Sequence, residues 1–260
     1  MKANSVTMKL TIRAIVISMA SVASIAQAQQ SSPRPTDVGA TTAQPDTGSE
    51  KKVADPVDGT LLDSYTGYYN VFGSQVLKVT REGNSLILDD GGRLTNAFLP
   101  LSDTSFTAED ADRGFVMNRE ANGDVSGMTL RLVADQMQAQ RIGPLVHRVE
   151  RQPDADPALT RRVEGVLRAF EQGGRAVEEV AGVAPQARKD FARGPAPEFT
   201  GIRSISFLTA HDVSDRGIKR HGAKVGRILY YQLLANNAPR HVLVYMTAAG
   251  LVTDEDVIGD

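Results

Sequence analysis

Turn-forming residue pairs interrupt the sequence between Leu61 and Ile142 at nearly regular intervals, and they constrain the fold more than any other feature. Gly83-Asn84, Gly91-Gly92 and Asn122-Gly123 are pairs that tolerate the backbone angles of tight hairpins. The apolar runs between such pairs are short and typical of β-strands. About eight strands predict a closed or nearly closed antiparallel barrel, because closure leaves no exposed strand edge. Seven of them are expected at residues 75–81, 85–88, 93–101, 105–108, 114–119, 125–133 and 136–142.

The spacing of apolar residues changes after residue 154. Leu159, Val163 and Phe170 recur at helical spacing behind Asp156-Pro157, a typical helix start, and Gly173-Gly174 predicts the helix end. Two shorter helices are expected at residues 176–183 and 185–193, followed by strands at 202–211, 224–234, 240–247 and 251–257. This order predicts an α+β module in which helices pack on a four-stranded antiparallel sheet.

The first 28 residues have the organisation of a secretory signal peptide. Lys2, Lys9 and Arg13 form a basic start, and the apolar run from Ala14 to Ile25 is too short to cross a bilayer core of about 30 Å. Ala26-Gln27-Ala28 provides the small residues of a cleavage site. We therefore expect an exported protein, periplasmic or secreted, with no membrane span.

Residues 29–57 are rich in Ser, Thr, Pro, Asp and Gly and have almost no large apolar side chain. Such a segment buries too little apolar surface to offset the entropy of ordering, so it is expected to be a disordered linker. The two folded domains are then expected at residues 58–150 and 151–260.

Composition excludes several classes of protein. There is no cysteine among the 260 residues, which excludes disulfides, thiolate zinc sites and a cysteine nucleophile. Lys plus Arg number 29 and Asp plus Glu 31, for a net charge of −2, which argues against a nucleic-acid partner held by electrostatics. No glycine-rich phosphate loop and no histidine pair at metal-binding spacing is found, so we expect no cofactor and no metal.

Several short motifs of the first domain resemble those of a known family. Tyr65-Thr66-Gly67-Tyr68-Tyr69 fits a Tyr-x-Gly-x-Tyr opening, residues 79–84 fit a first turn, and residues 99–106 fit the middle of the domain. Phe115, Asn118-Arg119 and residues 122–127 follow in the same order. Together they resemble the lipocalin-like domain that follows the catalytic domain of β-lactamase-related, penicillin-binding-protein-like serine hydrolases. The resemblance implies an all-β, lipocalin-like barrel.

The second domain resembles two groups of proteins. Its order of elements is similar to the cone of ketosteroid-isomerase-like and nuclear-transport-factor-like proteins, or to the cystatin-like wrap. Residues 216–225, Tyr230-Tyr231, residues 240–242 and residues 247–254 resemble a helix-plus-sheet module at the C-terminus of some of the same hydrolases. The resemblance points to a family and implies no activity.

The catalytic motifs of those hydrolases are not matched in a usable setting. Ser49-Glu50-Lys51-Lys52 fits Ser-x-x-Lys, but it falls in the expected linker, where nothing holds the lysine against the serine. Tyr68-Tyr69-Asn70 fits Tyr-x-Asn but belongs to the first barrel strand. The chain is therefore expected to be an accessory module without its enzyme, and not itself an enzyme.

Five residues are candidates for binding a ligand: His211, Asp212, His221, Tyr231 and Tyr69. A hairpin could bring the two histidines together, and a neighbouring carboxylate could orient an imidazole as a general base. The competing interpretation is a solvated turn over residues 213–224, with Arg216, Lys219, Arg220 and Lys224 at an exposed tip. Tyr230 and Tyr231 are consecutive on a strand, so their side chains must face opposite sides of the sheet. In the first domain, Tyr69 is also expected to help seal the end of the barrel.

Three functions follow from these observations, of which one, a structural role at the cell envelope, is supported only by the expected linker. The first is an exported, non-catalytic binding protein that takes a small apolar or peptidic ligand, or docks a serine hydrolase in trans. The alternative is a cone-type, ketosteroid-isomerase-like enzyme, with Asp212, His211 or Tyr231 as acid and base in a pocket of the second domain.

Overall fold

The computed structural model describes residues 57–71, 73, 75–91, 95–109, 112–132 and 135–258. The chain divides into two compact units, residues 1–50 and 51–260, and all described residues belong to the second. The expected signal peptide and all but the last residue of the expected linker lie outside the described residues. The boundary between domains at residue 150 stays a prediction.

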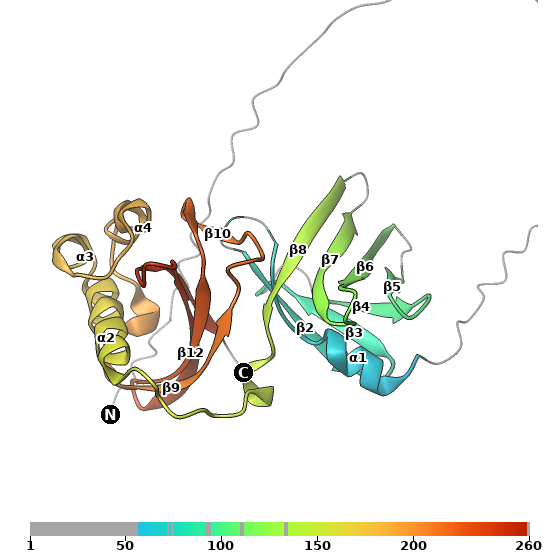
Figure 1. The fold of residues 1–260 in the computed structure, drawn as a ribbon, viewed down its shortest axis with the longest axis horizontal. Coiled ribbons are helices and arrows are strands. Elements are labelled where there is room, and N and C mark those ends of the chain that lie inside the picture. Colours follow the sequence, from blue (N-terminus) through green and yellow to red (C-terminus); the bar gives the residue numbers. More distant parts are fainter. Residues whose placement is uncertain are drawn as a thin grey trace, which may run out of the picture. The chain divides into compact units, whose positions relative to one another are not determined.

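Eight antiparallel strands form a closed barrel in which each strand pairs with the next and the last pairs with the first (Figure 1). The closed antiparallel barrel predicted from the turn pattern is thus confirmed. The strands are β1 (Gly67–Asn70), β2 (Val76–Glu82), β3 (Ser85–Asp89), β4 (Thr95–Pro100), β5 (Ser105–Ala108), β6 (Arg113–Arg119), β7 (Val125–Leu132) and β8 (Asp135–Gly143).

Alternation of buried and more exposed residues along the strands creates the barrel interior. In β2, for example, Leu77 and Val79 are buried and their neighbours are not. Aromatic rings fill much of the interior: Phe106 and Phe115 are stacked with centroids 4.8 Å apart, and Phe98 meets Phe115 edge-on at 5.1 Å.

A short helix, α1 (Gly59–Tyr65), precedes the barrel and was not predicted from the sequence. The Asp58 side chain caps it by accepting a hydrogen bond from the Thr60 amide, and Leu62 and Tyr65 are buried in the barrel core. Because α1 has only seven residues and both of these side chains pack in the barrel core, we attribute the stability of this helix to the barrel and not to its own sequence.

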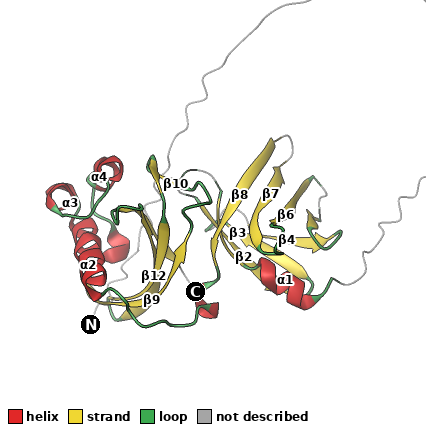
Figure 2. Cartoon of the chain, viewed as in Figure 1, coloured by secondary structure: helices red, strands yellow, loops and turns green. Residues whose placement is uncertain are grey.

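The second part of the described chain is α+β, as predicted. Its sheet has the order β14-β13-β12-β9, and Figure 2 shows the helices gathered on one side of it. The strands of this sheet are β9 (Ile202–Asp212), β12 (Arg227–Ala235), β13 (Ala238–Met246) and β14 (Val252–Ile258), and a separate two-stranded hairpin is formed by β10 (Lys219–Arg220) and β11 (Ala223–Lys224). The helices are α2 (Pro157–Gln172), α3 (Gly174–Glu179) and α4 (Pro185–Phe191), with 3₁₀ turns η1 (Val146–Arg148) and η2 (Pro197–Phe199).

Local signals explain where these elements begin and turn. The Asp156 carboxylate accepts from the Leu159 amide and caps α2, with Pro157 at the first helical position. Asn236 and Asn237, the predicted turn between β12 and β13, have φ angles of 49° and 62°, which asparagine tolerates better than most residues. Among the described residues, no helix has both the length and the apolar character required to cross a membrane.

Gly143, at the end of β8, is in close contact with a tyrosine of the sheet. A Cβ atom built at this glycine would lie 2.1 Å from the Tyr230 hydroxyl oxygen and 3.4 Å from a ring carbon of His211. Tyr230 is fully buried and donates a hydrogen bond of 3.3 Å to the carbonyl oxygen of Pro144, so its ring has little room to move.

We therefore expect Gly143→Ala to lower the free energy of unfolding by about 1–3 kcal/mol through overpacking. Tyr230→Phe, which removes the hydroxyl, should recover part of that loss when combined with Gly143→Ala. Urea denaturation of both single variants and the double variant tests this coupling.

Gly165→Ala in α2 is the control, because a Cβ there meets nothing within 4 Å. It should stabilise the protein by about 0.5–1 kcal/mol through helix propensity. Additive effects of Gly143→Ala and Tyr230→Phe would contradict the contact.

Candidate functional site

His211 lies on the side of the sheet opposite the helices. Its ring meets Tyr230 edge-on with centroids 5.1 Å apart, and its Nε2 atom is buried with no hydrogen-bond partner among the described residues. Burial lowers the pKa of His211, and the nearby Arg216 and Arg141 lower it further. The imidazole is therefore neutral near pH 7.

The other residues proposed from the sequence have separate surroundings. Asp212 is exposed and caps a turn by accepting from the Ser214 amide at 2.8 Å. Tyr231 belongs to the core under the helices, opposite Tyr230 as predicted, and its hydroxyl lies 3.4 Å from Thr160 Oγ1. Tyr69 is fully buried in the barrel, where its hydroxyl donates to the Tyr65 carbonyl oxygen at 2.6 Å. The structure thus does not bring these side chains together.

His221 bridges two carboxylates. Its Nδ1 lies 2.7 Å from Asp190 Oδ2 of α4, and its Nε2 lies 3.2 Å from Asp254 Oδ1 of β14. The hydrogen bond to Asp254 is the largest of the effects that raise the pKa of His221, and Asp190 adds to it. With a carboxylate on each ring nitrogen, this histidine holds its proton more tightly than a free imidazole and is poorly placed to act as a general base.

Arg220 was expected at a solvated hairpin tip, and that expectation is wrong. Its side chain is 0% exposed and forms ion pairs with Asp254 at 2.9 Å and Asp256 at 3.1 Å. Its guanidinium also lies 4.0 Å from the ring centroid of Tyr245. Lys219 and Lys224 of the same hairpin are exposed, as predicted.

We call Arg220, His221, Asp190, Asp254 and Asp256 the ion network. It ties the β10–β11 hairpin to β14 and, through Asp190, to α4. Sequence reasoning missed it because each of its contacts joins residues more than thirty positions apart along the chain. The one available signal was the Asp254-Glu255-Asp256 run on a strand that is otherwise apolar. Within the described chain no cluster of histidine and acidic side chains is arranged to hold a metal ion.

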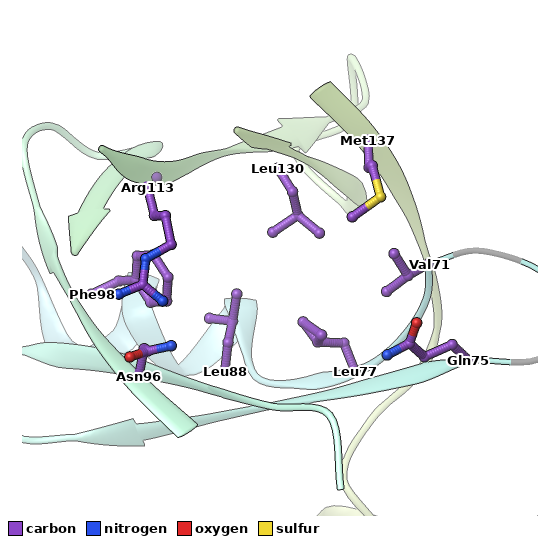
Figure 3. A pocket seen from close by; sticks show the side chains of 10 residues that line it. Val71, Gln75, Leu77, Leu88, Asn96, Phe98, Arg113, Leu130 and Met137 are labelled. Carbon is purple, nitrogen blue, oxygen red and sulfur yellow. The ribbon is translucent and has the colours of Figure 1, made fainter. Parts of the chain in front are cut away.

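The barrel interior contains a pocket of about 50 Å³ that opens near the β1–β2 connection. Along β2, Leu77 lines this pocket whereas Arg81 donates to the Gly59 carbonyl oxygen of α1, so pocket and helix lie at opposite ends of the barrel. Figure 3 shows the lining side chains pointing inward from several strands. The apolar ones are Val71, Leu77, Leu88, Phe98, Leu130 and Met137.

Three polar side chains complete the lining. Arg113 of β6 and Asn96 of β4 lie near Phe98 at one side of the pocket, and Gln75 lies at the other (Figure 3). All three are at least partly exposed, in contrast to the buried Leu77, Leu88 and Leu130. The pocket therefore combines an apolar floor with one guanidinium and two amides, an arrangement that can hold a small group with a polar or anionic end.

Comparison with known protein families, with curated proteins and with solved structures finds no match. The resemblance to accessory domains of serine hydrolases therefore remains a proposal, and the site must be interpreted from its own geometry.

The ion network predicts a pH dependence of stability. The pKa of His221 is higher in the folded protein than in the unfolded chain, where it is about 6.5. Its contribution to the stability is therefore fully present at a pH below 6.5 and is lost as the pH rises through the pKa of the folded state. His221→Asn, which keeps a residue tolerant of the local φ of 46°, should remove about 1–2 kcal/mol at pH 6 and less at pH 9.

Urea unfolding across this pH range measures the difference between wild type and variant. The exposed His147 provides a matched control, and His147→Asn should leave both the stability and its pH slope nearly unchanged. A His221→Asn difference that stays constant with pH would show that the imidazole is not protonated in the folded protein.

Removing one partner of the buried ion pair should be costly. Asp254→Asn leaves Arg220 with Asp256 as its one remaining ion-pair partner among the described carboxylates, and it also removes the negative charge that faces His221. We expect a loss of about 3 kcal/mol in the free energy of unfolding. Asp135→Asn, at an exposed position of β8, should change it by less than about 0.5 kcal/mol. Equal effects of the two substitutions in urea denaturation would contradict the network's role.

Proposed function

We propose that this protein is an exported, non-catalytic binding protein whose barrel holds the short apolar group of a small anionic ligand. The observation that carries the proposal is the pocket inside the closed barrel, with an apolar floor and Arg113 beside it. In this proposal the barrel is lipocalin-like, the second module is cystatin- or cone-like, and both derive from accessory domains of serine hydrolases.

The volume of the pocket limits the ligand. A single water requires about 10–15 Å³ of such space, so 50 Å³ accommodates about four non-hydrogen atoms. A branched or short linear alkyl group fits, whereas a whole long-chain lipid does not. The Arg113 guanidinium favours a carboxylate as the polar end, because such pairs form charge-assisted hydrogen bonds.

The placement of the titratable residues supports a binding role over the cone-type enzyme. An acid–base mechanism in the second module needs side chains that share an apolar cavity. Asp212 is instead exposed, Tyr231 is packed in the core, and His211 lies on the other face of the sheet. Docking of a serine hydrolase in trans remains a prediction.

A homologous series of carboxylates tests the pocket. From propionate to decanoate, binding should strengthen by about 0.8 kcal/mol per methylene until the alkyl chain has about four carbons, and then level off. Dissociation constants in the millimolar range are expected for ligands this small. Methyl NMR spectra suit such weak binding, and the signals of Leu88, Leu130 and Met137 should shift first. Affinity that keeps rising through decanoate, or shifts located elsewhere, would contradict the proposed pocket.

Two variants separate the apolar from the ionic contribution. Arg113→Gln should weaken carboxylate binding about tenfold while leaving a matched alcohol unchanged. Arg131→Gln is the control, since Arg131 is exposed on β7 opposite Gly114. Leu130→Phe should fill the pocket and remove binding of both ligand types, and its folded spectrum excludes loss of structure as the cause.

A further inference from the structure

β14 is an edge strand of the four-stranded sheet. It pairs with β13 on one side, and no described strand pairs with its other side. The barrel, being closed, offers no free edge. The outward N–H and C=O groups of β14 are therefore a potential template for pairing with another chain.

The start of this edge is covered by the protein itself. The Val252 amide donates to the Gly182 carbonyl oxygen at 2.7 Å, and the Ala184 amide donates to the Val252 carbonyl oxygen at 2.8 Å. From Asp254 to Ile258, no backbone hydrogen bond to another described segment is found on the outer side. About five residues of edge are left, the length of an ordinary strand.

A cleft of about 450 Å³ lies beside this uncovered stretch. Its volume falls within the range of about 300–1,000 Å³ that is typical of ligand sites. The barrel contributes Tyr68, Gln75, Val76, Lys78, Asp89, Asp90 and Gly91 to its lining, and β14 contributes Asp256, Val257 and Ile258.

The cleft reaches the backbone of β14 and not only one face of the strand. Consecutive strand residues point to opposite faces. Val257 packs against the core under the helices, whereas Ile258 packs with Tyr68 and Tyr230 on the other face. Since both residues line the cleft, the space between them includes the strand edge.

The charge of the cleft favours a basic occupant. Three carboxylates line it, those of Asp89, Asp90 and Asp256. Lys78 is the one basic side chain among the described residues that line the cleft, and Arg220 pairs with Asp256 from outside that lining. Tyr68, Val76 and Ile258 provide apolar surface beside these carboxylates.

We infer that the β14 edge and this cleft bind an extended basic peptide segment of another protein, which adds as a fifth strand next to β14. Its backbone pairs with residues 254–258. Alternate side chains face the barrel, an apolar one against Tyr68 and Val76 and a basic one near Asp89 and Asp90. Strand addition of this kind uses main-chain hydrogen bonds for affinity and alternate side chains for specificity.

The opposite edge of the sheet is less suited to this role. β9 is irregular, with register shifts opposite Tyr230/Tyr231 and Leu234/Ala235 that break its pairing surface. The Gln152 amide already donates to the Leu208 carbonyl oxygen at 2.7 Å in the middle of the strand. These are features that protect an edge from pairing.

Three synthetic peptides of about seven residues test the inference on the full chain. The first presents valine and lysine in turn along one face of the strand, with threonine at the positions between them. The second has glutamate in place of lysine, and the third has proline in place of one threonine. The first should bind and slow hydrogen exchange at those amides of residues 254–258 that point away from β13. The second and third should bind at least about tenfold more weakly, because one reverses the charge and the other removes a pairing N–H.

Variants of the cleft test the charge. Asp89→Asn combined with Asp90→Asn should weaken the valine–lysine peptide about threefold to tenfold and reduce the salt dependence of binding. Asp112→Asn is the control, an exposed aspartate of the barrel outside the cleft. Asp89 does not line the barrel pocket, so carboxylate binding there should be unchanged in the single variant Asp89→Asn.

Several results would overturn the inference. Absence of peptide binding would contradict it. So would peptide-induced protection from hydrogen exchange at β9 or in the barrel instead of at β14. Protection of the amides that point away from β13 before any peptide is added would show that the chain's own segment covers the edge. The same protection appearing with a concentration-dependent dimer would assign the edge to a second copy.

Discussion

Pairing of β1 with β8 is the interaction on which the rest of the structure depends. Tyr68 lies opposite Gly143 and Tyr69 opposite Arg141, with a register shift between them. This pairing closes the barrel and places the two tyrosines on opposite sides of its wall. Tyr69 fills the interior, whereas Tyr68 packs outside with Ile142 and Tyr230. The barrel pocket and the contact with the sheet both follow from one pair of strands.

Most of the unusual side chains of the second module serve its structure. Arg220 and His221 each contact two carboxylates, and Tyr231 is a core residue. Burial raises the pKa of Asp256 to about 6 and Arg220 opposes this shift, as expected for a carboxyl group held within an ion network. The properties suited to binding lie elsewhere, in the barrel pocket and along the uncovered edge of β14.

Local patterns predicted the regular elements well because strand alternation, helical spacing and hairpin pairs are written in consecutive residues. α2 begins at Pro157 as expected, and Asn236-Asn237 form the predicted turn. Contacts between distant residues were not predictable in this way. The α1 helix depends on burial of Leu62 and Tyr65 in the barrel, and the polar sequence around Arg220 concealed a fully buried guanidinium. The five proposed site residues are present in the fold without forming one site.

The central claim is that the barrel encloses an apolar pocket open to a small ligand. Xenon binds apolar cavities without requiring a polar partner, so it tests the pocket independently of any ligand. Methyl NMR spectra recorded under increasing xenon pressure should show saturable shifts for Leu88, Leu130 and Met137. Signals of Met117 and Met128, which lie in the barrel core but do not line the pocket, should change much less. Uniform, non-saturating shifts across the barrel would contradict the claim.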